Sequence, residues 1–391
     1  PVKVVAQLGG ATDTLVVIAP NGRRVQFDDV NATGTVGHKT IRIFEGNIIY
    51  GVLSARALGE LRAGDPMRLS GEATTRMIIE GQPEWRADAS FDGDLGKLPV
   101  IVTLQTPFRA DVSGDLLELN RAFHWAGKAK VHDFDLEDFG GGGALGIVSG
   151  TLEIGGEANA FHARGPLVVP GLGQGLFDVN FDGEYEDRVV KAARYEISHR
   201  PTGSRVTGAG TIEPADNGPE LALTGTWRQV RWPLAARFTA DRPELFSSAQ
   251  GDYTLQGSWP YALTARGDLQ LPGFDPMALD LHGRLHKEFL GIEHLEVGGF
   301  GGSAQLAGEA RWKPAESWTL AGKVARFDPG TIRSGFPGAL DFEMKASGAP
   351  FGAEGTLDFA FSNLRGKLRG TNASGSGRVV MQTEGFTFDR L

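Results

Sequence analysis

The chain contains no cysteine, only five tyrosines and no run of apolar residues long enough to cross a bilayer as a helix. The missing cysteines exclude a disulfide scaffold, a cysteine zinc site and a thiol enzyme. A membrane-spanning helix needs about 20 consecutive apolar residues, so none is predicted in these 391 residues. Basic residues number 39 against 48 acidic ones, a net charge of −9. This balance argues against a nucleic-acid-binding protein, which is usually basic.

Motifs of common enzymes are missing as well. There is no Gly-x-Ser-x-Gly nucleophile elbow and no phosphate-binding P-loop. His282 and His286 have the metal-ligand spacing of a helix, but in a strand they would lie about 13 Å apart, too far for one zinc ion. The acidic segment 133–138 departs from a calcium-binding loop at two required positions. We therefore predict no catalytic residue, no metal site and no cofactor, and a protein that is not an enzyme.

Hydrophobic residues alternate with polar ones along most of the chain. In 177–181 and in 357–361, for example, every second residue is Phe, Val or Leu. A period of two is typical of strands with one apolar and one polar face. Helical patterning is scarce: the best candidate is 115–129, whose second half fits a strand equally well, and short helical turns are expected near 58–61 and 328–334.

Glycine is abundant, with 56 residues, and it often lies in the apolar register of a strand, as at Gly225, Gly257 and Gly308. Such a glycine indicates either a bulge or turn, or a strongly curved sheet with a close approach across its concave side. The prediction is an all-β fold with very little helix: a long, strongly curved, mostly antiparallel sheet that forms an open hydrophobic groove, like a β-taco. We expect one continuous repetitive segment, 1–391, with a possible weak subdivision into 1–110 and 111–391.

The apolar face of such a sheet must be covered, because large exposed apolar surfaces are rare without a purpose. Two packed sheets would appear as modules of about 100 residues with boundaries between them, whereas this sequence keeps the same alternating strand pattern from end to end. A curled sheet would line a trough suited to acyl chains or to unfolded hydrophobic polypeptide. The predicted lining residues are Leu152, Ile154, Phe177, Val179, Phe181, Leu223, Trp227, Leu269, Leu271, Leu279, Leu281, Leu306, Leu320, Val324, Leu340, Phe342, Met344, Leu357, Phe359 and Phe361.

Four short elements carry a family resemblance over roughly residues 115–391. They are 124–127 with 144–146 and 149–150, then 224–234, then 327–330 with 336–342, and last 363–370 with 374–377. The second reads Thr-Gly-Thr-Trp-Arg-Gln-Val-Arg-Trp-Pro-Leu, and the third begins Phe-Asp-Pro-Gly. In this order along one chain, the elements resemble recurring segments of the TamB family, the translocation and assembly module proteins. The first hundred residues are similar to the family only in their general strand pattern, and not in specific elements.

The resemblance implies a periplasmic segment of a large bacterial envelope protein that is anchored in the inner membrane. It implies an outer-membrane partner of the Omp85 class, similar to TamA, bound through parts of the protein outside this segment. The wider AsmA-like group of bridge-like lipid transfer proteins implies phospholipid acyl chains as cargo in a hydrophobic β-groove. The chain begins at Pro1 without a methionine, and we expect it to be a piece of a longer protein.

The leading functional hypothesis is therefore transport of phospholipids between the inner and outer membranes, in support of outer-membrane assembly. A chaperone or scaffold for outer-membrane protein insertion, which would offer a strand edge to polypeptide, is the alternative. A secreted β-helix that binds or cleaves polysaccharide is a further alternative, although such a fold would favour stacked asparagines and a tighter repeat.

Overall fold

The structure is a computed structural model, and it describes residues 3–7, 14–18, 24–27, 29–78, 83–119, 121–139, 145–157, 159–186, 189–215, 218–235, 238, 244–350, 355–382 and 385–388. The chain divides into two compact units. Unit 1 comprises Pro1–Phe139, Ile147–Val168 and Val179–Asp187, and unit 2 comprises Gly140–Gly146, Val169–Asp178 and Arg188–Leu391.

Unit 1 begins with a three-stranded antiparallel sheet of β1 (Lys3–Gln7), β2 (Thr14–Ile18) and β3 (Arg24–Phe27). A larger antiparallel sheet follows, in which β4 to β13 pair with their neighbours in sequence. Its elements are β4 (Asp29–Val36), β5 (Thr40–Tyr50), β6 (Leu53–Arg62), β7 (Arg68–Met77), β8 (Trp85–Asp94), β9 (Lys97–Thr106), β10 (Ala110–Leu117), β11 (His124–Asp135), the 3-10 turn η1 (Leu136–Phe139), β12 (Ile147–Glu157), β13 (Ala160–Val168) and residues 179–186 of β14 (Leu176–Glu186).

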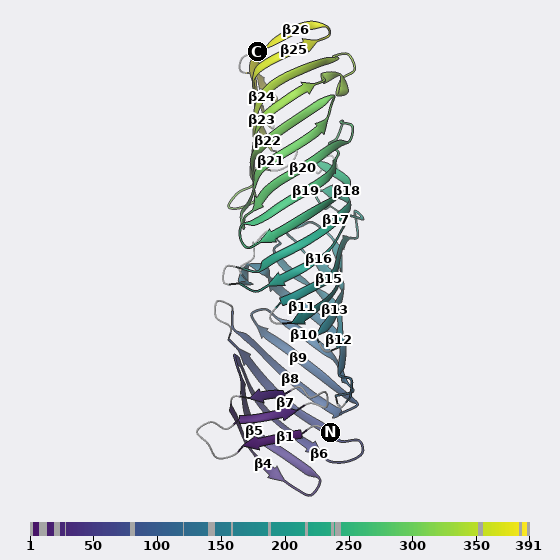
Figure 1. Cartoon of the computed structure of the whole chain (residues 1–391), viewed down its shortest axis with the longest axis vertical. Helices are drawn as coiled ribbons and strands as arrows, with labels where there is room; N and C mark the ends of the chain where they lie inside the picture. Colours follow the sequence, from purple (N-terminus) through teal and green to yellow (C-terminus); the bar gives the residue numbers. More distant parts are fainter. Residues whose placement is uncertain are drawn as a thin grey trace. The chain divides into compact units, whose positions relative to one another are not determined.

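Unit 2 has the same kind of strand pairing: β15 to β27 pair antiparallel with their neighbours in sequence. Figure 1 shows β19 to β26 side by side in chain order. The elements of unit 2 are residues 176–178 of β14, β15 (Val189–His199), β16 (Arg205–Glu213), β17 (Glu220–Trp232), β18 (Phe246–Gly257), β19 (Tyr261–Leu269), β20 (Met277–Leu285), β21 (Phe289–Gly299), β22 (Gly302–Arg311), β23 (Ser317–Phe327), the 3-10 turn η2 (Pro329–Thr331), β24 (Gly338–Ala349), β25 (Thr356–Leu368), β26 (Thr371–Gln382) and β27 (Gly385–Phe388).

The predicted all-β fold, with a strongly curved, open antiparallel sheet, is confirmed. The short turn expected near 328–334 is confirmed as η2, whereas the turn expected at 58–61 is wrong, because these residues lie within β6. The helix considered for 115–129 is also wrong, because β10 ends at Leu117, whereas the strand alternative for its second half is confirmed, because β11 begins at His124. In the described ranges, neither 3-10 turn is long or apolar enough to span a bilayer, and no longer helix is present.

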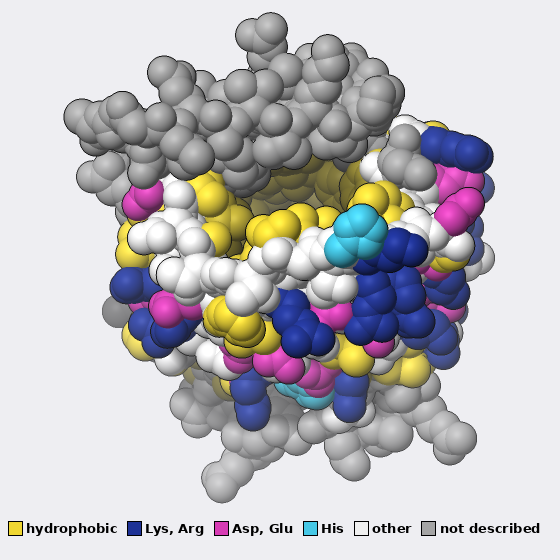
Figure 2. All heavy atoms as spheres, turned by 90° about the horizontal axis from the view of Figure 1, so that it is seen from below, with side chains coloured by type: hydrophobic (Ala, Val, Ile, Leu, Met, Phe, Trp, Pro, Cys, Tyr) yellow, Lys and Arg dark blue, Asp and Glu magenta, His cyan; other side chains and the backbone are white. Residues whose placement is uncertain are grey.

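Along the larger sheet in each unit, the strands alternate between an apolar face, which we call the inner face, and a more exposed outer face. In β9, Val100, Val102 and Leu104 lie on the inner face and are partly buried. The residues between them, Ile101 and Thr103, are exposed on the outer face. Figure 2 shows the result from below: hydrophobic side chains line a hollow, while charged side chains gather outside it. Strand alternation thus separates an apolar lining from a solvated exterior.

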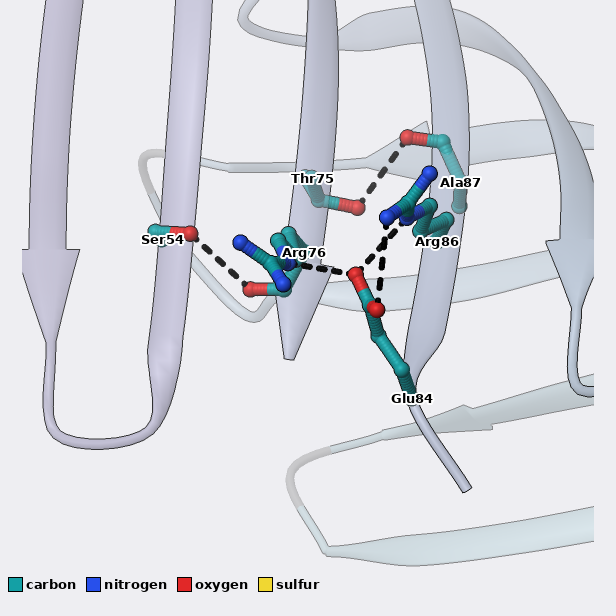
Figure 3. Close-up of polar contacts among 6 residues, drawn as sticks. All are labelled: Ser54, Thr75, Arg76, Glu84, Arg86 and Ala87. Atoms are coloured by element: carbon teal, nitrogen blue, oxygen red, sulfur yellow. Dashed lines mark hydrogen bonds and ion pairs between the residues drawn. The ribbon is translucent and has the colours of Figure 1, made fainter. Parts of the chain in front are cut away.

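Glu84 lies between two arginines of the outer face in unit 1 (Figure 3). It follows β7 in the chain and accepts hydrogen bonds from Arg76 and from Arg86, the latter with an Nε···Oε1 distance of 2.7 Å. These two side-chain hydrogen bonds, with that of Arg86 the stronger influence, lower the pKa of Glu84 from 4.5 to about 2. The carboxylate therefore stays charged into acid.

This shift predicts how acid affects unit 1. A carboxyl group whose pKa is lower in the folded state adds stability that is complete above its unfolded pKa, 4.5, and is lost as the pH falls through its folded value, about 2. Glu84→Gln should therefore unfold at a lower temperature than the unmodified chain at pH 6, and the difference should shrink below pH 4.5. Thermal unfolding from pH 2 to 7 tests this.

The control for that experiment is Glu220→Gln, which removes a carboxylate of β17 with no ion pair in the described part of the chain. Because this substitution removes no ion pair of the described residues, we expect the variant to unfold at nearly the temperature of the unmodified chain at pH 6. If the difference in unfolding temperature between Glu84→Gln and the unmodified chain stayed constant down to pH 2, the two hydrogen bonds would not be lowering the pKa of Glu84.

Candidate functional site

An apolar cavity of about 710 Å³ lies in unit 2. It runs along the inner face from β19 to β25, and every residue that lines it is hydrophobic. The lining residues are Leu269, Leu271, Phe274, Met277, Leu295, Val297, Phe300, Ala304, Leu306, Leu320, Val324, Phe327, Ile332, Leu340, Phe342, Met344, Phe359, Phe361 and Leu364. A cavity without a polar group offers no hydrogen bond, so it suits a hydrocarbon ligand.

The strand registers explain why these side chains share one face. Directly paired residues of neighbouring strands point to the same side of a sheet. One row of paired residues runs Leu279, Val297, Ala304, Val324 and Phe342. The next row runs Leu281, Leu295, Leu306, Gly322, Met344 and Phe361. Because both rows are apolar from β20 onward, the lining is continuous across successive strands.

Phenylalanine rings form a connected chain at the last strands of the cavity. Phe327 meets Phe342 edge to face with ring centroids 6.0 Å apart, and Phe342 meets Phe361 in the same manner at 6.4 Å. Phe359 and Phe361 lie on one strand with centroids 6.3 Å apart. Aromatic pairs at such distances attract each other beyond the effect of burial alone. The rings therefore hold one another in place while leaving a wholly apolar surface.

Charge is confined to the opposite face of these strands. Asp358, next to Phe359 in β25, accepts a hydrogen bond of 2.9 Å from Arg378 Nε of β26. That hydrogen bond lowers the pKa of Asp358 below its usual value. The charged side chains of β25 and β26 thus lie on the face opposite the cavity.

The structure places the predicted lining residues in four groups. Half of them lie on the cavity: Leu269, Leu271, Leu306, Leu320, Val324, Leu340, Phe342, Met344, Phe359 and Phe361. Others lie on the inner face of unit 2 beside it: Leu223, Trp227, Leu279, Leu281 and Leu357. Unit 1 contains Leu152, Ile154, Val179 and Phe181, and Phe181 stacks on Phe161. Phe177 is only 2% exposed and packs on His199, with ring centroids 4.8 Å apart. Contact of any of them with a cargo stays a prediction.

Sequence reasoning missed several lining residues. Phe274, Phe300 and Ile332 lie in connections between strands, where alternation defines no face. Leu295 and Val297 follow a register shift in β21 that lies between Ile292 and Leu295. After this shift, the residues of β21 on the inner face are odd-numbered instead of even-numbered. The sequence does carry a sign of this change, because the apolar residues Leu295 and Val297 flank the charged Glu296.

Two hydrogen-bonded pairs of polar side chains lie on the inner face in β15 to β18. The hydroxyls of Tyr195 and Tyr253 are hydrogen-bonded at 2.5 Å, and Trp227 Nε1 donates to Ser248 Oγ at 2.6 Å. Burial, and then the hydrogen bond with Tyr195, raises the pKa of Tyr253. Tyr253 is therefore neutral at physiological pH. The glycines Gly208 and Gly225 lie beneath the two phenol rings, and an added Cβ there would fall within 3 Å of them.

The residues considered for metal binding take other partners. His282 Nε2 lies 3.0 Å from Asp280, and His286 stacks on Phe289 with centroids 4.1 Å apart. Asp133 accepts a hydrogen bond of 2.6 Å from the backbone N–H of Arg109. In the part of the chain that the structure describes, no group of three or more His, Asp or Glu side chains is placed to hold a metal ion.

Residues 203–387 match a family model described as TamB, N-terminal domain. The match includes the whole cavity lining and three of the four elements on which the resemblance in the sequence rests; of the remaining element, Ala144 lies outside the described residues. No curated protein and no solved structure matches the chain.

Proposed function

Because the chain is a segment of a TamB-family protein, we propose that it carries phospholipids between the inner and outer membranes of a bacterial envelope, along its hydrophobic inner face. The match and the curved β-sheet fit a bridge-like segment of such a protein. The family implies a periplasmic, envelope-associated location. In this proposal the segment does its work without catalysis, by providing an apolar surface on which acyl chains lie.

The observation that carries the proposal is the cavity of about 710 Å³ with its wholly hydrophobic lining. Removing a methylene group from water contributes about 0.8 kcal/mol, so an acyl chain of ordinary length offsets the loss of freedom that accompanies its binding. Exposed apolar surface of this extent is otherwise a liability for a soluble domain. A hydrocarbon ligand needs only apolar contacts, and this surface supplies them.

The remaining parts of the proposal concern partners. We place the inner-membrane anchor, and the docking on an outer-membrane protein of the Omp85 class similar to TamA, in parts of the protein outside this segment. In the family, TamB works with TamA in assembly. Supply of phospholipid to the outer membrane would support that assembly.

The test is to purify the full chain and to extract and identify bound lipids by mass spectrometry, followed by transfer of a labelled phospholipid between donor and acceptor vesicles. We expect about stoichiometric phospholipid and transfer that rises with protein concentration. A lipid-free protein that instead captures unfolded outer-membrane protein would contradict lipid transport and support the chaperone alternative.

A further inference from the structure

One lateral edge of the cavity is formed by the turns that join alternate strand pairs. In an antiparallel sheet built from consecutive hairpins, every second turn lies at the same edge. The turns after β19, β21, β23 and β25 therefore share one edge, and they contribute Phe274, Phe300 and Ile332 to the cavity lining. Backbone hydrogen bonds link neighbouring turns here: Asp328 N donates to Phe300 O at 2.9 Å, and Arg369 N donates to Pro337 O at 2.8 Å.

Two arginines and a phenylalanine form a cluster at this edge, which we call the rim cluster: Arg333, Phe336 and Arg369. The guanidinium carbon of Arg333 lies 5.5 Å from the centroid of the Phe336 ring, and that of Arg369 lies 5.7 Å from it. Cation–π attraction at these distances holds both guanidinium groups near one ring. Ile332, the neighbour of Arg333 in sequence, is 52% exposed and also lines the cavity, so the cluster borders the apolar surface directly.

Nearby carboxylates are occupied elsewhere. Asp328 Oδ1 accepts hydrogen bonds from the backbone N–H groups of Gly330, at 2.8 Å, and Gly338, at 2.7 Å. Asp341 accepts from Arg326 N at 2.8 Å. Among the residues that the structure describes, neither Arg333 nor Arg369 has a carboxylate within ion-pair distance. Most arginines of the outer face, by contrast, are paired, as Arg266 is with Asp280 and Arg284 with Glu293.

We propose that the rim cluster binds the phosphate group of a phospholipid whose acyl chains lie in the cavity. The planar guanidinium group presents paired N–H donors that match phosphate oxygens, and its charge is permanent. Two such groups at the edge of an apolar surface match an amphiphile whose charged group is joined directly to hydrocarbon. Phe336, 37% exposed beside them, adds an aromatic surface at the boundary between cavity and water.

This inference rests on the proposed lipid-carrying function and adds a headgroup preference to it. The cavity alone would bind a diacylglycerol and a phospholipid with the same chains about equally well, because it contacts only hydrocarbon. The rim cluster adds contacts that only the phosphate can make, so it favours the phospholipid. The contribution of the charges should weaken with salt, because exposed charges are screened.

The experiment compares two ligands with identical acyl chains, phosphatidylglycerol and diacylglycerol, in binding to the full chain at low salt. The variant is Arg333→Gln/Arg369→Gln, and the control is Arg266→Gln/Arg284→Gln, which removes the same charge from the outer face of β19 and β20. We expect the preference for phosphatidylglycerol to fall more than about tenfold in the rim variant and to persist in the control. Diacylglycerol binding should stay unchanged in both, which also shows that the variants are folded.

The outcomes separate the two claims. An unchanged preference in the rim variant, with both lipids still bound, overturns the phosphate site and leaves the lipid-carrying function standing. Failure of the unmodified chain to bind either lipid overturns both. Inorganic phosphate at the concentration of the lipid should not displace phosphatidylglycerol, because it lacks the acyl chains; displacement would show a site for free phosphate and contradict the lipid headgroup.

Discussion

Phe361→Asp should abolish phospholipid binding by the cavity of unit 2. Phe361 belongs to the lining, and its ring lies 6.4 Å from that of Phe342 within the chain of phenylalanine rings. The change removes the burial of a large apolar side chain, worth about 1.5–3 kcal/mol, and it places a charge where no partner can compensate it. The lost burial alone corresponds to about ten- to hundredfold weaker binding. Binding of a fluorescent phospholipid to the full chain measures the effect.

The adjacent residue provides a matched control. Ala360 pairs with Lys345 on one side and with Arg378 on the other, both on the outer face. Ala360→Asp therefore introduces the same charge one residue away, between two cations, and should leave lipid binding intact. If both variants lost lipid binding equally, a charge on the outer face would weaken binding as much as a charge on the inner face. That result would contradict the cavity as the binding site. Far-ultraviolet circular dichroism shows whether each variant keeps its strands.

Gly251→Val should destabilise unit 2 more than any other change proposed for it. Gly251 is paired with Trp227 across β17 and β18, and an added Cβ would lie 2.0 Å from Trp227 Cζ2. The indole must move, and it then loses the 2.6 Å hydrogen bond from its Nε1 to Ser248 Oγ. Overpacking of this kind costs about 1–3 kcal/mol, and the lost hydrogen bond adds about 1 kcal/mol. Urea denaturation of the full chain measures the loss.

Gly375 provides the control for this substitution. It lies in β26, paired with Leu364, and an added Cβ there would meet nothing within 4 Å. Gly375→Val should therefore leave the urea midpoint nearly unchanged. If both variants lost the same stability, backbone effects of replacing glycine would explain the result, and the close contact between Trp227 and Gly251 would not be needed.

The fold class could be predicted because the decisive signal is local. Runs such as 357–361 alternate so regularly that one face is assigned without knowing any neighbour, and the structure places Phe359 and Phe361 together on the cavity. Strand pairing then follows from order along the chain, since consecutive strands joined by short turns pair with each other. These two rules account for most of the sheet in both units.

The errors arose where local spacing imitates a helix. Leu58 and Leu61 are three residues apart, as on a helical face, but in β6 they point to opposite sides: Leu58 is 49% exposed opposite Glu72, and Leu61 pairs with Leu69. Between β10 and β11, the spacing of Leu116 and Leu119 spans a strand end and a turn. Leu119 N donates there to Leu95 O at 2.9 Å, a bond to the turn between β8 and β9 that a sequence pattern does not reveal.

The rim of the cavity was beyond sequence reasoning for a related reason. Ile332 directly follows η2 in the turn after β23 and reaches the lining, and the Asp328 carboxylate holds this turn through hydrogen bonds from the backbone N–H groups of Gly330 and Gly338. The two arginines of the rim cluster lie 36 positions apart and meet at Phe336 only because the turns after β23 and β25 lie at one edge. Alternation assigns faces to strands, and it assigns none to turns.

The most direct test of the central claim is site-specific photocrosslinking with a benzophenone amino acid at Met344, compared with the same probe at Lys345. Both are neighbours in β24, and Met344 lines the cavity whereas Lys345 is on the outer face. If the inner face carries lipid, illumination in cells should attach phospholipid at 344 and little or none at 345. Crosslinks from 344 to polypeptide alone, or equal lipid labelling at both positions, would contradict a lipid-carrying inner face.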